Sequence, residues 1–354
     1  MTVTQALKYA MKGAPEAGLE SRPRPEHPRP VPCLTRRSRV GRTGISLSDS
    51  QPLYQLSYSG VVASRNPLYR RACAGSEQTS CRMTARVPIE QRFPRPSVMG
   101  VVNVTPDSFS DGGVNYAPED AVASARRMLD EGAAIVDVGG ESTRPGSEGV
   151  TLDEELRRVL PVLEALTGEP VSIDTSKAEV ARRALSLGAE LVNDVTALRA
   201  DPELAGVVAE AGAYLCLMHM RGEPRTMQED PRYDDVASEV AAFLEERLRF
   251  AVDAGVSEDH ICLDPGIGFG KTVEQNFELV RRLDVLLALG RPVVVGFSRK
   301  SSLGRLLGDP GATTGSAAAS VGAAVAAYER GATILRVHDV RETVEALTVA
   351  GAIL

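Results

Sequence analysis

The sequence has no tryptophan, and aromatic residues make up only 4% of its 354 positions. That scarcity argues against a β-sandwich anchored by a buried tryptophan. No apolar run reaches the roughly 18 residues that a membrane-spanning helix requires, and no apolar core of a secretory signal follows Met1. We therefore expect a soluble protein without a membrane partner.

Cysteine is scarce too. The five cysteines include no CxxC pair and no cluster with other metal ligands, and Cys216 and Cys262 each lie alone in an apolar segment. This usage fits a reducing cytoplasm. A chain of this length can bury a large share of its surface, so we expect the fold to need neither disulfide bonds nor a structural metal.

Acidic residues are few near the N-terminus, although the whole chain carries a formal net charge of −7. Residues 1–82 contain two Lys and eleven Arg against five acidic residues, a local charge of +8. A basic arm can bind nucleic acid. This one has no binding motif, is rich in Pro, Gly and Ser, and shows no helical or strand period. We expect residues 1–96 to be a disordered extension with no nucleic-acid partner.

Two explanations of the extension stay open. Its Arg-rich, acid-poor composition is typical of organellar transit peptides. Alternatively, Met83 is the natural start, because it precedes the first apolar strand by the short approach typical of a barrel domain. The second explanation is favoured, and we expect residues 1–82 to be dispensable for activity and stability.

From residue 97 to residue 354, eight short apolar segments alternate with stretches of helical periodicity, such as 118–131, 235–254 and 273–290. This repeat predicts an α/β fold, a (β/α)8 TIM barrel. A doubly wound sheet is less favoured, because no GxGxxG follows the first strand. The predicted strands cover 98–102, 133–137, 171–174, 190–194, 213–219, 260–264, 292–300 and 334–339.

Polar residues close these strands. In a parallel barrel the site lies at the carboxyl ends of the strands, so these residues should form one ring. A single polar residue there is often only a cap, but a converging set is costly unless a polar ligand satisfies it. The ring consists of Asn103, Asp137, Asp174, Asn193, Met218, His219, Asp264, Lys300, Arg336 and His338.

The ring has two chemical halves. Ser298, Arg299 and Lys300 follow the seventh strand, and Arg336 and His338 close the eighth, where barrels commonly bind phosphate. Across the mouth lie two carboxylates and an amide, which suit a flat heterocycle with adjacent N–H donors and a carbonyl. An amino-pyrimidinone carrying an anionic group fits both halves. The residues of the second half are Asp174, Asn193 and Asp264.

The segment LDPGIGFGKT (263–272) is nearly a Walker A loop, but Pro265 stands where that motif needs glycine. Its glycines instead predict a close backbone approach to a ligand, with Phe269 as a wall or lid against a ring. His219 has no metal-ligating neighbour at a useful spacing, and we expect it to be structural. Met218 either contacts the ligand or fills the core, and the sequence does not decide between these two roles.

Eight motifs in this order resemble those of the dihydropteroate synthases, and the likeness covers about residues 97–354. Related pterin-binding barrels, such as the corrinoid methyltransferases, resemble the fold and the pterin acids but not the SRKS, RVHD and GGESTRPG segments. The motifs are NVTPDSFSDGG (103–113), DVGGESTRPG (137–146), SIDTSK (172–177), NDV (193–195), LMHM (217–220), LDPGIGFGK (263–271), GFSRKS (296–301) and RVHDV (336–340).

The resemblance implies a transferase of folate biosynthesis. Such an enzyme condenses (7,8-dihydropterin-6-yl)methyl diphosphate with 4-aminobenzoate, giving 7,8-dihydropteroate and diphosphate. It also implies Mg2+ held near Asn103, a cytoplasmic location and a homodimer.

The resemblance further implies a role for each matching residue. The pterin would contact Asp174, Asn193, Met218, Asp264, Phe269 and Lys300. The diphosphate would contact Asn103, Thr143, Arg336 and His338. The aminobenzoate would contact Phe109, Thr143, Arg144, Pro145, Phe269, Ser298 and Lys300. Catalysis would depend on Asp174, Lys300, Arg336 and His338.

Two other functions remain in view. A catalytically silent relative would bind a pterin and form no product. A Schiff-base aldolase would use Lys300 to attack a sugar-phosphate carbonyl, but it leaves the paired acids Asp174 and Asp264 unexplained.

Overall fold

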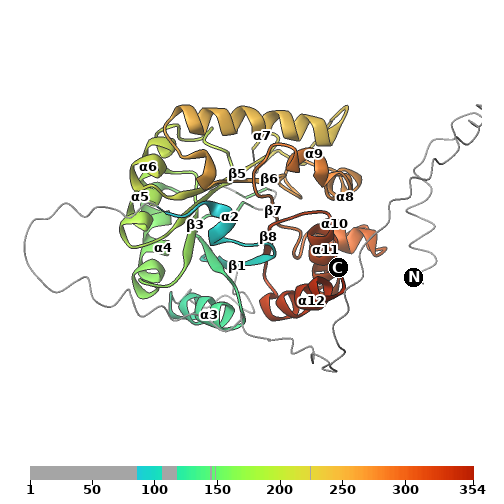
Figure 1. Ribbon diagram of the computed structural model, residues 1–354, viewed down its shortest axis with the longest axis horizontal. Coiled ribbons are helices and arrows are strands. Elements are labelled where there is room, and N and C mark those ends of the chain that lie inside the picture. The colour runs from blue at the N-terminus through green and yellow to red at the C-terminus, as the bar shows by residue number, and fades with distance from the viewer. Residues whose placement is uncertain (1–85, 106–117, 144–145, 148, 224) are drawn as a thin grey trace, which may run out of the picture. The chain divides into compact units, whose positions relative to one another are not determined.

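The computed structural model describes residues 86–105, 118–143, 146–147, 149–223 and 225–354. Eight parallel strands lie at the centre and helices surround them (Figure 1). The strands are β1 (Ser97–Asn103), β2 (Ile135–Gly139), β3 (Val171–Asp174), β4 (Leu191–Asp194), β5 (Tyr214–Met218), β6 (Ile261–Asp264), β7 (Val294–Val295) and β8 (Ile334–Val337).

The strands form a closed barrel. Their order is β6-β5-β4-β3-β2-β1-β8-β7, and every pairing is parallel. A parallel bridge between Leu263 and Val293 joins the two ends, and the Leu263 N–H donates to the Pro292 carbonyl at 2.9 Å. Closure leaves no open sheet edge. The predicted (β/α)8 barrel is confirmed.

Helices follow the strands as predicted, and one further short helix, α2 (Ile89–Arg92), precedes β1. The others are α3 (Pro118–Asp130), α4 (Leu152–Ala165), α5 (Ala178–Ser186), α6 (Glu203–Ala211), α7 (Val236–Asp253), α8 (Val273–Arg281), α9 (Leu283–Leu287), α10 (Ser301–Leu306), α11 (Ala317–Glu329) and α12 (Val340–Ile353), with a 3-10 turn, η3, at Glu258–His260. No helix of the described residues is both long and apolar enough to cross a bilayer.

Three predicted boundaries were wrong. The helix expected over 273–290 is broken at Arg282, whose backbone leaves the helical region (φ −108°, ψ 37°) and whose guanidinium binds Asp235 at 2.8 Å. Strand β7 covers only Val294 and Val295, because the chain leaves the ladder at Gly296. Strand β2 continues past Asp137 to Gly139, so Asp137 lies within the strand.

Side chains along each strand alternate between two apolar cores. Met99 of β1 and Ile334 of β8 point into the barrel, while their neighbours Val98 and Leu335 face the helices. This alternation follows from the two-residue period of a strand. The barrel interior is therefore packed at the end where the strands begin.

Helix α2 closes that end of the barrel, and in Figure 1 it lies across the middle of the strand ring. Ile89 and Phe93 are fully buried among the first residues of the strands. The hydroxyl of Tyr214 donates to the carbonyl of Val87 at 2.8 Å, and its ring meets Phe93 edge-on. Residues 86–96, expected to belong to the extension, thus pack on the barrel and contribute Ile89 and Phe93 to its core. They were missed because a helix of four residues gives no periodic signal.

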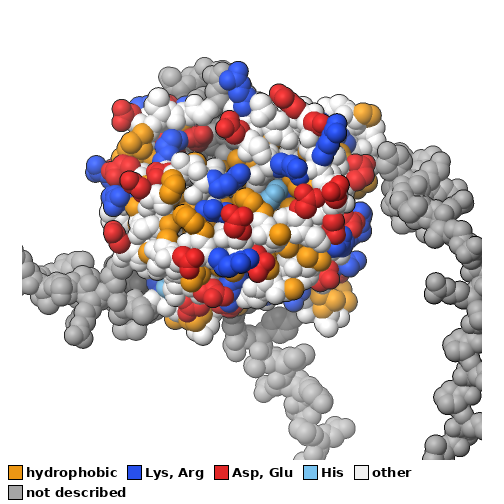
Figure 2. Space-filling model, turned by 90° about the horizontal axis from the view of Figure 1, so that it is seen from above, with side chains coloured by type: hydrophobic (Ala, Val, Ile, Leu, Met, Phe, Trp, Pro, Cys, Tyr) orange, Lys and Arg blue, Asp and Glu red, His pale blue; other side chains and the backbone are white. Residues whose placement is uncertain are grey.

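Charged side chains of both signs are interspersed on the face drawn in Figure 2. Across the described part of the chain many such side chains pair with each other, as Arg182 does with Glu179 at 3.2 Å. Exposed pairs of this kind contribute little to stability, because water screens them and ordering them costs entropy. The two apolar cores therefore carry most of the stability of the barrel.

The role of α2 and its C-cap in closing the barrel can be tested by removing the buried side chain of Phe93, the residue directly after the helix. We expect Phe93→Ala to lower the free energy of unfolding by about 3 to 5 kcal/mol, because it leaves a cavity in the barrel floor. Val87→Ala is the matched control, since the Val87 side chain is 47% exposed, and it should change the value by less than about 0.5 kcal/mol. Urea denaturation measures both. Equal midpoints would show that α2 is only an appendage.

Candidate active site

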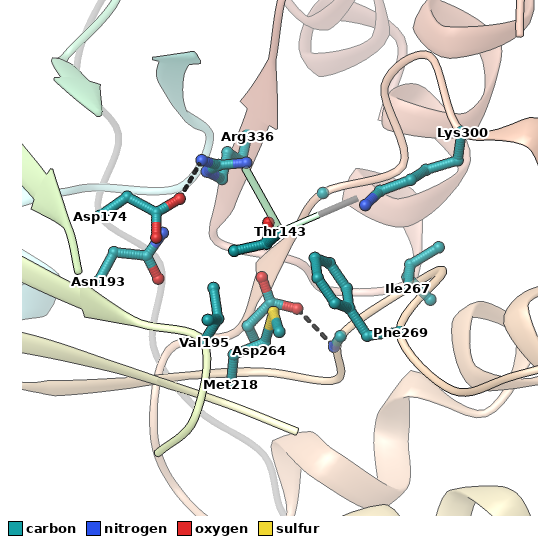
Figure 3. Close-up of a pocket in the computed structure, with 12 residues that line it drawn as sticks. Thr143, Asp174, Asn193, Val195, Met218, Asp264, Ile267, Phe269, Lys300 and Arg336 are labelled. Carbon is teal, nitrogen blue, oxygen red and sulfur yellow. Dashed lines mark hydrogen bonds and ion pairs between the residues drawn. The ribbon is translucent and has the colours of Figure 1, made fainter. Parts of the chain in front are cut away.

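A pocket lies at the carboxyl ends of the strands (Figure 3). Its empty volume, open solvent included, is about 330 Å³. Strand ends and the loops after them supply its walls. The lining residues are Thr143, Asp174, Asn193, Val195, Met218, Asp264, Gly266, Ile267, Phe269, Gly296, Lys300 and Arg336.

Arg336 of β8 bridges two carboxylates beneath the pocket. Its Nε donates to Asp137 Oδ2 at 2.7 Å, and its Nη2 donates to Asp174 Oδ2 at 2.8 Å (Figure 3 shows the second bond). The amide of Asn193 also donates to Asp137 Oδ2, at 2.9 Å. Asp137 was expected at the mouth, but it is fully buried and lies below it. Its contacts with Arg336 and Asn193 show that it orients residues of the pocket.

The charges of this network shift its pKa values. Burial raises the pKa of Asp174 to about 8, and the nearby charge of Asp137 adds to the shift. Burial also disfavours the charged form of Arg336, but the two carboxylates outweigh that effect and raise its pKa. Arg336 is therefore a cation, while burial disfavours the charged form of Asp174.

Asp264 lies across the pocket from this network and is supported by the loop after β6. Its Oδ1 accepts from the backbone N–H of Gly266 at 2.7 Å (Figure 3). Burial raises the pKa of Asp264. Gly266 has φ +67°, and a side chain there would meet the His219 carbonyl oxygen at 1.9 Å. Glycine is required because the loop passes against the end of β5.

Lys271 fastens the same loop from inside. It is 3% exposed, and its Nζ lies 2.9 Å from Gly266 O, from Phe269 O and from His219 Nδ1. Burial lowers the pKa of Lys271 well below its ordinary value. Burial, with the charge of Lys271, lowers the pKa of His219 to about 2. The structural role predicted for His219 is confirmed, whereas the role of Lys271 was missed because a lysine beside a glycine-rich loop suggests an exposed base.

One wall of the pocket combines an aromatic ring with a cation. The Lys300 Nζ lies 4.2 Å from the centroid of the Phe269 ring. Phe269 also belongs to a buried cluster with Met218 and Val195. A flat ligand in the pocket can therefore contact apolar atoms on one side and a cation beside the ring. Val195 and Ile267 were missed, because a search for polar strand ends does not find apolar wall residues.

The basic side of the mouth contains Ser298 and His338. His338 Nδ1 lies 3.1 Å from Ser298 Oγ, which also accepts from the His338 backbone N–H at 3.2 Å. Burial lowers the pKa of His338 to about 3, and the positive charge of Arg336 contributes. Arg299, expected in this group, instead pairs with Asp339 at 2.7 Å and is half exposed. It adopts φ +56°, so the turn carries its side chain away from the pocket.

The remaining predicted site residues divide into two groups. Asn103 ends β1 opposite Gly139, and it is not among the pocket-lining residues, nor are Ser298 and His338. Phe109, Arg144 and Pro145 lie outside the described residues.

The donors for a metal ion are few. The part of the chain that the structure describes holds no group of three His, Cys, Asp or Glu side chains that could bind one.

Comparisons with known proteins agree with this geometry. Residues 99–338 match the family model described as pterin binding enzyme. A dihydropteroate synthase of Escherichia coli K12 is 48% identical over 264 residues, which are 73% of this chain and 92% of that protein.

Solved structures are similar over the same region. A dihydropteroate synthase of Yersinia pestis, solved in complex with a sulfonamide drug, is 45% identical with a TM-score of 0.69 and covers 73% of this chain and 94% of its own. One of Xanthomonas albilineans, solved with 7,8-dihydropteroate, is also 45% identical, has a TM-score of 0.65 and covers 74% and 94%. Because these relatives match nearly their whole length at high identity, the chain belongs to the dihydropteroate synthase family of pterin-binding transferases.

Proposed function

We propose that this chain forms 7,8-dihydropteroate and diphosphate from (7,8-dihydropterin-6-yl)methyl diphosphate and 4-aminobenzoate. The observation that carries the proposal is one pocket that brings two carboxylates and an amide together with two cations. The residues are Asp174, Asn193, Asp264, Lys300 and Arg336. A relative of Xanthomonas albilineans that is 48% identical was solved with 4-aminobenzoic acid, which supports the second substrate.

The acidic side of the pocket binds the pterin. A pterin presents adjacent N–H donors and one carbonyl, and Asp174, Asn193 and Asp264 offer the matching acceptors and amide. Asp264 has acceptor capacity left after its bond from Gly266, because a carboxylate offers about four lone-pair sites. Met218 and Phe269 flank the ring, and Lys300 lies near its carbonyl and ring nitrogen.

The basic side binds the diphosphate through Thr143, Arg336 and His338. Mg2+ fits this site as an ion that arrives with the substrate, since it keeps several waters and binds substrate phosphates with only one or two protein oxygens. Asn103 would supply one such oxygen. When bound, the ion would neutralise charge on the leaving group.

In the reaction the carbon–oxygen bond between the pterin methylene and the diphosphate breaks, and diphosphate leaves with the electron pair. The amino nitrogen of aminobenzoate forms the new bond to that methylene and loses one proton. Lys300 and Arg336 stabilise the negative charge that develops on the diphosphate. His338 and Asp174 complete the catalytic set, and the aminobenzoate lies among Thr143, Phe269, Ser298 and Lys300 and the undescribed Phe109, Arg144 and Pro145.

The activity itself is directly testable. The purified chain, given the pterin diphosphate, 4-aminobenzoate and Mg2+, should form dihydropteroate, and chelation of Mg2+ should suppress the product. Liquid chromatography with mass detection measures it. A chain that binds the pterin substrate but forms no dihydropteroate is a silent family member, and this outcome rejects the proposal.

The pterin site is tested at Asp264. We expect Asp264→Asn to weaken binding of the pterin substrate at least about tenfold, because charge-assisted hydrogen bonds are worth about 1.5 to 3 kcal/mol each. The substituted amide oxygen can still accept from Gly266, so the loop should stay in place. Asp259→Asn, at the other end of the barrel and 49% exposed, is the control. Calorimetric titration measures the affinity of both variants for the pterin substrate. An unchanged affinity in Asp264→Asn would show that Asp264 does not bind the pterin.

We further propose that residues 1–82 are dispensable. The support is that the Escherichia coli relative matches 73% of this chain over 92% of its own length, and that the family model begins at residue 99. A chain that begins at Met83 should keep its activity and its melting temperature within about 2 °C. A chain that begins at Ser97 should lose about 4 kcal/mol or more, because Ile89 and Phe93 are removed. A large loss on removal of residues 1–82 alone contradicts the proposal.

We also propose that the chain works as a homodimer in the cytoplasm. The resemblance of the sequence motifs implies both statements, and the cysteine usage fits a reducing compartment. Sedimentation at micromolar concentration distinguishes a dimer from a monomer.

A further inference from the structure

Glu155 of α4 is a buried carboxylate that the proposed reaction does not use. Its side chain is only 1% exposed. Burying a carboxylate costs desolvation free energy unless the group is paired and hydrogen-bonded. Its Oε1 accepts from the Thr175 hydroxyl at 2.6 Å, and its Oε2 accepts from Lys177 Nζ at 2.6 Å. Thr175 and Lys177 lie in the turn after β3, directly beyond Asp174. The outer helix α4 is thus joined to the rim of the pocket.

Lys177 extends this link to the loop after β2. Its Nζ also donates to Glu141, which follows the glycine pair at the end of β2. Lys177 is 27% exposed and Glu141 is 25% exposed, so the pair is sheltered and worth more than an exposed one. Burial opposes the charge of Lys177, but the hydrogen bonds to Glu141 and Glu155 outweigh it and raise its pKa. One ammonium group therefore bridges a helix residue and a loop residue.

The backbone at the base of this loop is held from the same side. The Gly140 carbonyl accepts from Arg158 Nη1 at 2.8 Å. A side chain at Gly140 would meet Val159 Cγ1 at 2.7 Å, so the loop packs directly against α4. Where the loop returns, a side chain at Gly149 would lie 3.3 Å from Glu141 Oε1. The Glu141 side chain therefore lies between the start of the loop and Gly149, where the loop returns.

The bridge stands beside both halves of the pocket. Two residues after Glu141 the loop reaches Thr143, which lines the pocket, and three residues before Lys177 lies Asp174. Gly139, which precedes this loop, would contact Asp174 Cβ at 3.3 Å if it carried a side chain. The distance between the loop and Asp174 is thus set by contacts at 139–141 and 174–177.

From this arrangement we propose that the Glu141–Lys177–Glu155 bridge is a positioning device that holds Thr143 at the pocket. None of the three residues lines the pocket, so the bridge acts through Thr143 and not on the substrate. The inference rests on the proposed function, in which Thr143 contacts the diphosphate and the aminobenzoate. It assigns to Lys177 and Glu141 a share in binding the second substrate.

The test is a double-mutant cycle with Glu141→Ala, Lys177→Met and their combination. Glu141→Ala is the informative single variant, because it leaves the buried pair of Glu155 and Lys177 intact. We expect each single change to raise the KM for 4-aminobenzoate about tenfold or more, since small displacements of a contacting group have effects of this size. The double variant should be within about twofold of Lys177→Met, because both changes remove one link. Affinity for 6-hydroxymethylpterin should stay within about twofold.

The matched control is the exposed pair of Glu179 and Arg183 on α5, in which Arg183 Nε lies 2.8 Å from Glu179 Oε1. Glu179→Ala and Arg183→Met remove the same charges from the next helix but should leave every kinetic constant unchanged. A general effect of surface charge would appear equally in these variants. That result would overturn the proposal, as would an unchanged KM in Glu141→Ala or fully multiplicative effects in the cycle.

A second readout does not depend on activity. Backbone amides in peptides that cover residues 138–143 should exchange with deuterium faster in Glu141→Ala than in the parent chain, while the control variants should match the parent. If the parent chain makes no dihydropteroate, the proposed function fails and this measurement still decides the anchoring of the loop. Equal exchange in all variants shows that the bridge does not hold the loop, whatever the activity.

Discussion

The guanidinium of Arg336 is the group on which the rest of the site depends. It stands inside the barrel between the carboxylates of Asp137 and Asp174, at 2.7 and 2.8 Å. Burying these three charges separately would cost several kcal/mol each, so their mutual contacts are a condition for the barrel to contain them. The amide of Asn193 adds a bond to Asp137. Strands β2, β3, β4 and β8 are therefore held in fixed relation at their carboxyl ends.

Basic side chains from distant parts of the chain make similar contacts around the mouth. Lys271 holds the loop after β6 by its carbonyl groups, and Lys177 joins the loop after β2 to α4. In each case a long basic side chain crosses from one βα unit or loop to another. Because such contacts link neighbouring units, the positions of the pocket residues follow from the whole ring rather than from any single loop. This gives a rigid scaffold on which loops can carry substrate contacts.

The sequence predicted what is periodic or polar and missed what depends on depth and packing. Alternating strands and helices indicated the barrel, and polar strand ends indicated Asp174, Asn193, Asp264 and Arg336. A strand pattern does not state where the ladder stops, so Asp137 was expected at the mouth although β2 continues to Gly139. Lys271 was missed because the acceptors that bury a lysine come from the folded loop and from β5. The short helix α2 likewise owes its existence to tertiary packing, since four residues are too few for a stable isolated helix.

Burial shifts the pKa values of titratable groups on both sides of the mouth. Two carboxylates share Arg336, and burial raises the pKa of Asp174 to about 8, so the pocket disfavours the charged form of this carboxyl. A ligand whose N–H groups donate to Asp174 stabilises the carboxylate form and opposes this shift. Burial lowers the pKa of His338 to about 3. An anion bound beside Arg336 and His338 favours the protonated imidazole and therefore raises this pKa. Ligand binding therefore lowers the pKa of Asp174 on the acidic side and raises the pKa of His338 on the basic side. A molecule that combines N–H donors with an anionic group relieves the unfavourable desolvation of both, which a ligand with only one of these features cannot do.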